Sequence, residues 1–136
     1  MTVENSAQAS EPAKDLRIAA LIAYGLFLAA VMNGFTAVVG LVLAYVKRSD
    51  ARGTVYESHF ENLITLFWVS LVIGILLAGA LMFGIFGLAM ALSKGYPGLA
   101  LFWLPVSYFG WVVLAVWYLY RTVKGLMRAI DGKPYA

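Results

Sequence analysis

Residues 63–92 read LITLFWVSLVIGILLAGALMFGIFGLAMAL, thirty consecutive positions without a charged side chain. A helix needs about 20 apolar residues to cross the roughly 30 Å hydrocarbon core of a bilayer. Within lipid a helix satisfies its backbone amides and carbonyls internally, so an unbroken helix is the favoured structure. The stretch therefore predicts a membrane-spanning helix that is either tilted or extends past the hydrocarbon core.

The composition of the whole chain also indicates a membrane protein. Hydrophobic residues make up 62% of the 136 residues and charged residues only 12%, with a mean hydropathy of +0.84. A soluble domain has about 25% charged residues, because it must cover its core with polar surface. These numbers predict that the surface of this protein faces lipid, and without a soluble domain we expect no nucleic-acid partner.

The residues do not predict an enzyme. The chain has no cysteine, which excludes disulfides, thiolate metal ligands and a cysteine nucleophile. We find no nucleophile beside a base, no paired carboxylates, no phosphate-binding loop and no cluster of metal ligands in the sequence. We therefore expect no catalytic, cofactor-binding or metal-binding site.

Two further apolar stretches, residues 18–46 and 99–120, accompany the first. The stretch 99–120 has the length of one span. The stretch 18–46 contains Asn33-Gly34, a dipeptide that favours turns because both residues tolerate positive φ. Residues 18–46 therefore form either one over-long helix or two short helices in a hairpin. The second short helix would have to thin the bilayer, extend through Lys47-Arg48, or form a re-entrant hairpin that the other helices shield from lipid.

The placement of the basic residues favours the hairpin. Cytoplasmic loops of membrane proteins carry an excess of Lys and Arg. With four membrane segments, nine of the ten basic residues lie on the side of both termini, and only Lys94 lies opposite. With three spans, Lys14 and Arg17 change sides and the division becomes seven to three. We therefore predict an all-α integral membrane helical bundle with four membrane segments and cytoplasmic N and C termini.

The expected segments have defined bounds. The membrane domain covers residues 16–130, with segments at about 16–32, 35–47, 54–92 and 99–130. Polar residues 1–15 are expected to form a disordered cytoplasmic tail, and residues 131–136 a second cytoplasmic tail.

Local signals support these bounds. Thr54 and Glu57 have the spacing of a capping box, in which the hydroxyl and the carboxylate accept from each other's backbone amides. Residues 93–98, SKGYPG, predict a turn. Gly132 followed by Pro134 predicts a helix end with a left-handed residue.

Polar and charged side chains gather at the cytoplasmic ends of the expected segments. We define a predicted polar cluster that consists of Arg48, Arg52, Glu57, His59, Glu61, Asn62, Arg121 and Lys124. Charges near hydrocarbon need partners, so we expect Glu61, and Glu57 as a second candidate, to pair with Arg121 or Lys124.

Two alternatives involve His59, the single histidine. A proton or ion site could use His59 together with Glu61. A haem could bind His59, although it would need a second ligand or an open coordination position. The simpler interpretation, which we prefer, is that His59 is a hydrogen-bonding residue at the membrane edge.

Small residues and basic residues suggest further contacts. Small residues four positions apart, such as Gly74 with Ala78 and Gly87 with Ala91, let helix backbones approach closely in lipid. This pattern fits packing within the bundle, and the alternative is packing between two copies. The basic residues are expected to contact anionic headgroups, and an acidic partner protein is the alternative.

Residues 44–60, AYVKRSDARGTVYESHF, resemble a family of small bacterial four-helix membrane proteins of unknown function. Residues 120–126, YRTVKGL, and 131–134, DGKP, are also similar to that family. The family is distantly related to the twenty-kilodalton component of the chloroplast inner-envelope import translocon. The resemblance covers residues 17–134, implies four membrane helices in a bacterial inner membrane, and marks Arg48, Glu57, His59 and Arg121 as residues of interest.

These observations favour a non-catalytic role. We expect a structural or accessory subunit of a membrane assembly, with another membrane protein or a second copy of the chain as partner. The alternative is a transport or protein-translocation component, as a monomer or a homo-oligomer. Against that alternative, the expected spans contain no row of polar residues that would line a pore.

Overall fold

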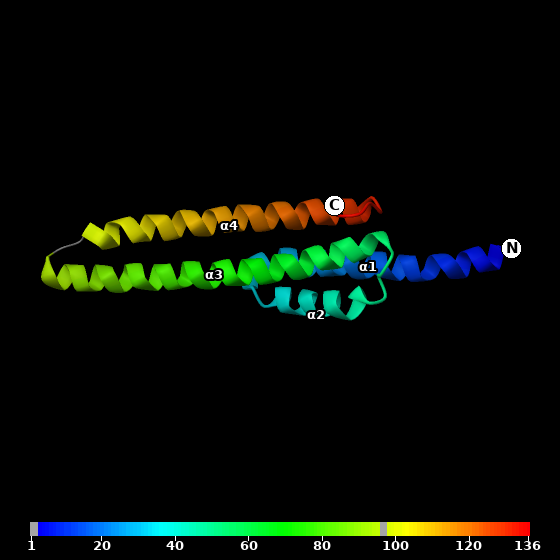
Figure 1. Cartoon of the computed structure of the whole chain (residues 1–136), viewed down its shortest axis with the longest axis horizontal. Coiled ribbons are helices and arrows are strands. Elements are labelled where there is room, and N and C mark those ends of the chain that lie inside the picture. Colours follow the sequence, from blue (N-terminus) through cyan, green and yellow to red (C-terminus); the bar gives the residue numbers. More distant parts are fainter. Residues whose placement is uncertain (1–2, 96–97) are drawn as a thin grey trace. The chain divides into compact units, whose positions relative to one another are not determined.

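A computed structural model of the chain contains four helices in the residues that it describes: α1 (Val3–Asn33), α2 (Thr36–Arg48), α3 (Val55–Lys94) and α4 (Gly98–Ile130) (Figure 1). It describes residues 3–95 and 98–136, and the side chains from residue 11 onward except those of residues 99 and 100. Three described helical stretches are long and apolar enough to cross a membrane, namely Glu11–Asn33, Val55–Lys94 and Leu101–Ile130. The prediction of an all-helical chain with four helices is confirmed.

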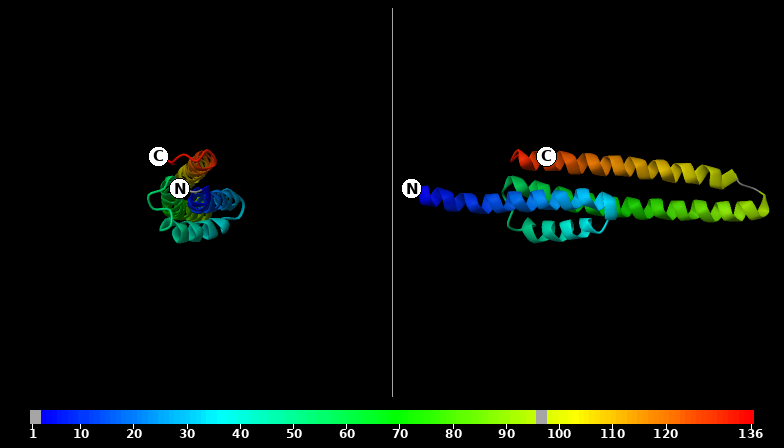
Figure 2. Two further views of the ribbon diagram at one scale, coloured as in Figure 1. Left: turned by 90° about the vertical axis from the view of Figure 1, so that its right-hand side faces the viewer. Right: turned by 180° about the vertical axis from the view of Figure 1, so that it is seen from behind.

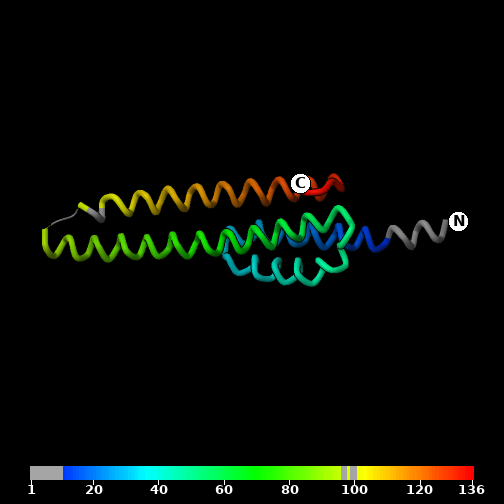
Figure 3. The backbone as a smooth tube through the Cα atoms, in the orientation of Figure 1, coloured from blue at the N-terminus to red at the C-terminus, as the bar shows by residue number. Residues whose placement is uncertain are grey.

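The Asn33-Gly34 dipeptide separates α1 from α2, and the chain reverses direction there (Figure 3). Gly34 has a φ of +70°, in the left-handed region that glycine adopts without steric cost. The side-chain oxygen of Asn33 accepts a hydrogen bond from the amide of Thr36 at 3.1 Å, which satisfies a free donor at the start of α2. Of the two interpretations of residues 18–46, the chain thus adopts the two-helix form.

The two helices lie side by side in both side views (Figures 1 and 2). A Cβ added at Gly40 of α2 would lie 2.8 Å from Cδ2 of the buried Phe27 of α1. The hydroxyl of Thr36 donates to the carbonyl of Leu26 at 2.9 Å. At 13 residues, α2 is about 20 Å long, which is shorter than a full crossing.

The chain divides into two compact units, residues 1–67 with 119–136 and residues 68–118. In the second unit, α3 packs on α4 through glycines that let the backbones approach. A Cβ at Gly84 would lie 3.3 Å from Cδ2 of Leu104, and one at Gly74 would lie 3.7 Å from the Trp111 ring. Gly87 has no neighbour within 4 Å. Part of the predicted small-residue pattern therefore serves packing within the chain.

The start of α1 differs from the prediction. Residues 3–15, which we expected to be disordered, are helical and continue directly into the apolar part of α1. Alanine and residues with unbranched side chains have high helix propensity, and extending an existing helix avoids the cost of a new nucleus. The other helix ends lie within two residues of the predicted bounds. Residues 1–2 of the expected tail and 96–97 of the expected turn lie outside the described residues.

The start of α3 corrects the capping-box prediction. The carboxylate of Glu57 accepts from the amide of Gly53 at 2.9 Å, rather than from that of Thr54. The hydroxyl of Thr54 accepts from the amide of Tyr56 at 3.3 Å and donates to the carbonyl of Ala51 at 2.6 Å. Gly53 has a φ of +76° and presents its own amide to the carboxylate, so each capping bond is displaced by one residue.

The end of α4 agrees with its prediction. Gly132 has a φ of +68°, and its amide donates to the carbonyl of Ala129 at 3.2 Å. The amide of Lys133 donates to the carbonyl of Arg128 at 2.9 Å. These two bonds form a Schellman motif, which satisfies the last carbonyls of the helix and turns the chain away from its axis.

Candidate functional site

The first unit contains a buried row of polar side chains that joins three helices. Tyr24 comes from α1, His59 and Asn62 come from α3, and Arg121 comes from α4. Tyr24 and His59 have no exposed surface, and Asn62 is also buried. His59 and Asn62 are three residues apart and therefore share one face of α3. We call these four side chains, together with the carbonyl of Lys133, the polar chain.

Hydrogen bonds run through the polar chain in one direction. Arg121 Nη2 donates to Asn62 Oδ1 at 2.6 Å, and Asn62 Nδ2 donates to the Tyr24 hydroxyl at 3.2 Å. The Tyr24 hydroxyl lies 3.1 Å from Nδ1 of His59. The Nε2 atom of His59 lies 2.7 Å from the carbonyl oxygen of Lys133.

The last contact assigns the histidine tautomer. A carbonyl oxygen only accepts, so Nε2 of His59 carries the proton that it donates to Lys133. In a neutral ring, Nδ1 is then an acceptor, and the Tyr24 hydroxyl donates to it. Each member donates to the next, and the row of buried polar groups is satisfied from Arg121 to Lys133.

A glycine allows this arrangement. A Cβ added at Gly125 of α4 would collide with the phenol of Tyr24, so the two helices can approach only if this position lacks a side chain. Tyr24 also meets the ring of His59 edge-on, with ring centroids 5.7 Å apart. Sequence reasoning missed both Tyr24 and Gly125. Nothing in the sequence distinguishes this tyrosine and this glycine from the many other tyrosines and glycines of the apolar stretches.

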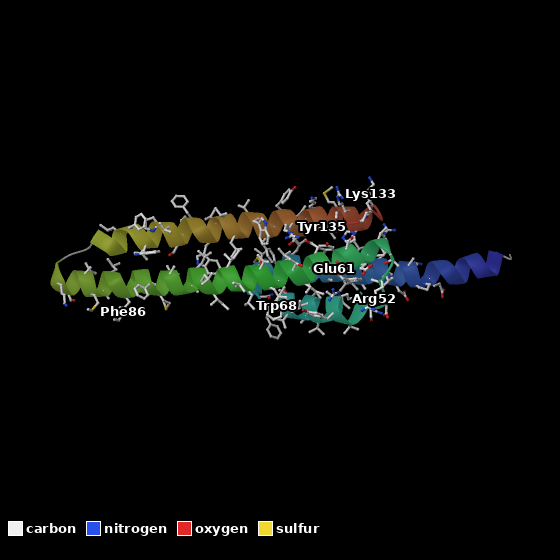
Figure 4. The ribbon with its side chains drawn as sticks, in the orientation of Figure 1. Arg52, Glu61, Trp68, Phe86, Lys133 and Tyr135 are labelled. Atoms are coloured by element: carbon white, nitrogen blue, oxygen red, sulfur yellow. The ribbon has the colours of Figure 1, made fainter. Side chains whose placement is uncertain are left out.

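The C-terminal tail, residues 131–136, is folded onto the same end of α3 and α4 (Figure 4). The amide of Tyr135 donates to Oγ of Ser58 at 3.0 Å, and Nε of Arg121 donates to the Tyr135 hydroxyl at 3.1 Å. Arg128 donates to the carbonyls of Pro134 and Tyr135 at 3.1 and 3.2 Å. We expected residues 131–136 to form a tail, and side chains of α3 and α4 hold this tail in place.

The structure corrects the predicted ion pair. The carboxylate of Glu61 lies 3.1 Å from Nη2 of Arg48, and both side chains are about half exposed. Arg121 instead enters the polar chain, and the ammonium of Lys124 lies 5.3 Å from the centre of the Tyr135 ring. The pairing differs because α2 presents Arg48 to Glu61, and sequence spacing did not indicate which helix Glu61 would face.

The predicted polar cluster is thus only partly one site. His59, Asn62 and Arg121 meet in the polar chain. Arg52 is exposed in the loop before α3, and Glu57 caps that helix.

The arrangement bears on the two alternatives for His59. Glu61 is directed to Arg48 at the surface, whereas His59 is buried against Tyr24 and Lys133, so the two do not form a shared proton or ion site. Both ring nitrogens of His59 are engaged, and a haem iron would have to displace one of these bonds. Among the residues with described side chains, no group of three or more histidines and carboxylates is placed to hold a metal.

No protein-family model matches the sequence, and comparisons with curated proteins and with solved structures give no match. The resemblance to the bacterial four-helix family therefore stays a prediction.

Proposed function

We propose that the chain is a non-catalytic multi-pass protein of a bacterial inner membrane and serves as a structural or accessory subunit of a membrane assembly. The polar chain is the observation that supports this proposal most. A transport pathway would need the histidine, asparagine and arginine of the polar chain to be available to a proton, an ion or a solute. They are instead bonded to one another, to Tyr24 and to the tail, and so join three helices.

The apolar surface supports the assembly role. Only 6% of an apolar 18-residue stretch of α3 is buried within the chain. In the second unit, Ile75, Phe83 and Phe86 are 62%, 79% and 70% exposed, and Phe86 points away from α4 (Figure 4). Such a surface is stable against lipid or against the apolar face of another membrane protein. Gly79 lies on the same side by helical spacing and has no neighbour within 4 Å, which leaves room for a close helix–helix approach.

The proposed topology has both termini in the cytoplasm and the α1–α2 hairpin crossing the bilayer, which is thinned around the short α2, so that the Asn33-Gly34 turn lies at the opposite face. The excess of basic residues on the side of the termini supports it. At 40 residues α3 is about 60 Å long, twice the hydrocarbon core, so its ends extend beyond the lipid tails. Reporter fusions at residue 34 and at the C-terminus should give opposite locations, and matching locations would contradict the topology.

The assembly role is tested by purification at native expression level in a mild detergent, followed by identification of membrane proteins that co-purify in fixed ratio. Gly79→Leu and Gly25→Leu are matched variants, because neither glycine has a neighbour within 4 Å and both should fold. We expect the wild type and Gly25→Leu to retain the partner and Gly79→Leu to lose it.

The opposing outcomes are also defined. A lone monomer recovered from wild-type membranes would contradict the accessory role. Solute or ion flux into liposomes that contain only the purified protein would instead support the transport alternative.

A further inference from the structure

We propose that the C-terminal tail is a strap that stays docked only while His59 is neutral, so that acidification on the tail's side of the membrane releases it. This inference goes beyond the assembly role and does not depend on it. It rests on the hydrogen bonds of the polar chain and of the tail.

The docked tail depends directly on His59. The Nε2 atom donates to the carbonyl of Lys133 at 2.7 Å, in the first residue after Gly132. Two residues further on, the ring of Tyr135 meets the ring of His59 edge-on, with centroids 6.3 Å apart. Ser58, next to His59 on α3, accepts from the amide of Tyr135 at 3.0 Å. One turn of α3 therefore holds both ends of the segment from Lys133 to Tyr135.

A proton on Nδ1 of His59 is incompatible with the present bond from Tyr24. Nδ1 would change from acceptor to donor, and it faces the Tyr24 hydroxyl at 3.1 Å. That oxygen already accepts from Asn62. It would then face two donors, and its own proton would lose its acceptor inside a buried site, where an unpaired polar group is costly.

Protonation strengthens the bond from Nε2 to the Lys133 carbonyl, and this bond opposes release of the tail. The other groups around the ring provide no carboxylate that would compensate the added charge. The groups around the ring and the tail are Tyr24 from α1, Tyr56 from α3, Arg121, Lys124 and Arg128 from α4, and Lys133 and Tyr135 from the tail. The nearest carboxylates along α3, Glu57 and Glu61, are bound to the Gly53 amide and to Arg48. Asp131 of the tail is exposed. An imidazolium is therefore buried among cations, and detachment of the tail relieves this because it exposes the ring to water and moves Lys133 away. Burial and the neighbouring cations outweigh the one strengthened bond, so the strap should detach.

The chain is well suited to a direct test, because it contains one histidine and no cysteine. We would attach a nitroxide to Ala136→Cys in full-length protein in nanodiscs, and record its mobility from about pH 8 to about pH 5, the range around ordinary histidine titration. The imidazole signals of ¹⁵N-histidine-labelled protein report the protonation of His59 in the same samples. We expect a mobile component to appear on acidification, with the same midpoint as the imidazole titration.

Two matched variants complete the design. A nitroxide at Ser49→Cys, an exposed position in the loop after α2, should show no such transition. His59→Gln replaces the titrating ring by a neutral amide, so its tail mobility should not change with pH, whether the tail is docked or free. The proposal is overturned if the tail stays immobile while the imidazole titrates, if the two midpoints differ, or if His59→Gln keeps the pH response.

Discussion

Replacement of Gly125 by alanine tests the contact on which the polar chain depends. The added methyl group would collide with the phenol of Tyr24. The end of a side chain can usually move aside, but this phenol is fully buried and bonded to both Asn62 and His59. Relief of the collision therefore requires either a shift of α4 away from α1 or rotation of the ring, and rotation breaks both hydrogen bonds.

The size of the effect follows from three terms. Overpacking of a filled site costs about 2 kcal/mol. Loss of two buried hydrogen bonds costs about 1 kcal/mol each. Alanine in place of glycine in a helix stabilises by about 1 kcal/mol. The expected net loss in the free energy of unfolding is about 3 kcal/mol, roughly a hundredfold change in the folding equilibrium.

The assay is unfolding in mixed micelles of a mild detergent and dodecyl sulfate, followed by circular dichroism. Gly25→Ala is the matched control, because Gly25 adjoins Tyr24 in α1 and has open space around it. The control should match the wild type or exceed it by up to about 1 kcal/mol. In a Tyr24→Phe background, the Gly125→Ala change should cost about 2 kcal/mol less, because the hydrogen bonds are already absent. A Gly125→Ala protein as stable as the wild type, beside a well-behaved control, would refute the reasoning.

Three further predictions concern other contacts of the first unit. Asn62→Ala should lower the free energy of unfolding by about 2–4 kcal/mol, because it removes the acceptor of Arg121 Nη2 in a buried site. A loss below about 1 kcal/mol in the same assay would contradict this prediction. A double-mutant cycle of Arg48→Gln and Glu61→Gln should give a coupling free energy of about 0.5 kcal/mol in stability. Because both side chains are half exposed, this coupling should fall in high salt, and a coupling insensitive to salt would argue against an ion pair. Gly40→Ala should destabilise the hairpin by about 1–2 kcal/mol through contact with the facing aromatic ring of α1, and unchanged stability would mean that the ring swings aside.

Several features of the fold were predictable because their causes are local. An uncharged stretch of thirty residues specifies a helix in lipid wherever it occurs, since backbone groups there have no other partner. The turn at Asn33-Gly34 and the end of α4 at Gly132 follow from residues that tolerate positive φ, and both have the predicted conformation. The helical start of α1 was missed because a polar composition was taken to indicate disorder, whereas helix propensity favours extension of the helix.

The sequence by itself thus determined which segments are apolar and helical in lipid, because solvent preference and backbone conformation there are properties of neighbouring residues. It did not show that residues 3–15 extend the first helix. The tertiary structure alone decided that Glu61 meets Arg48, that Tyr24 meets Gly125, and that the tail returns to His59. His59 and Lys133 are 74 positions apart, and Asn62 and Arg121 are 59 apart. Helical periodicity tells which residues share a face, but the rotation and depth of each helix against its neighbours depend on how all their side chains pack together.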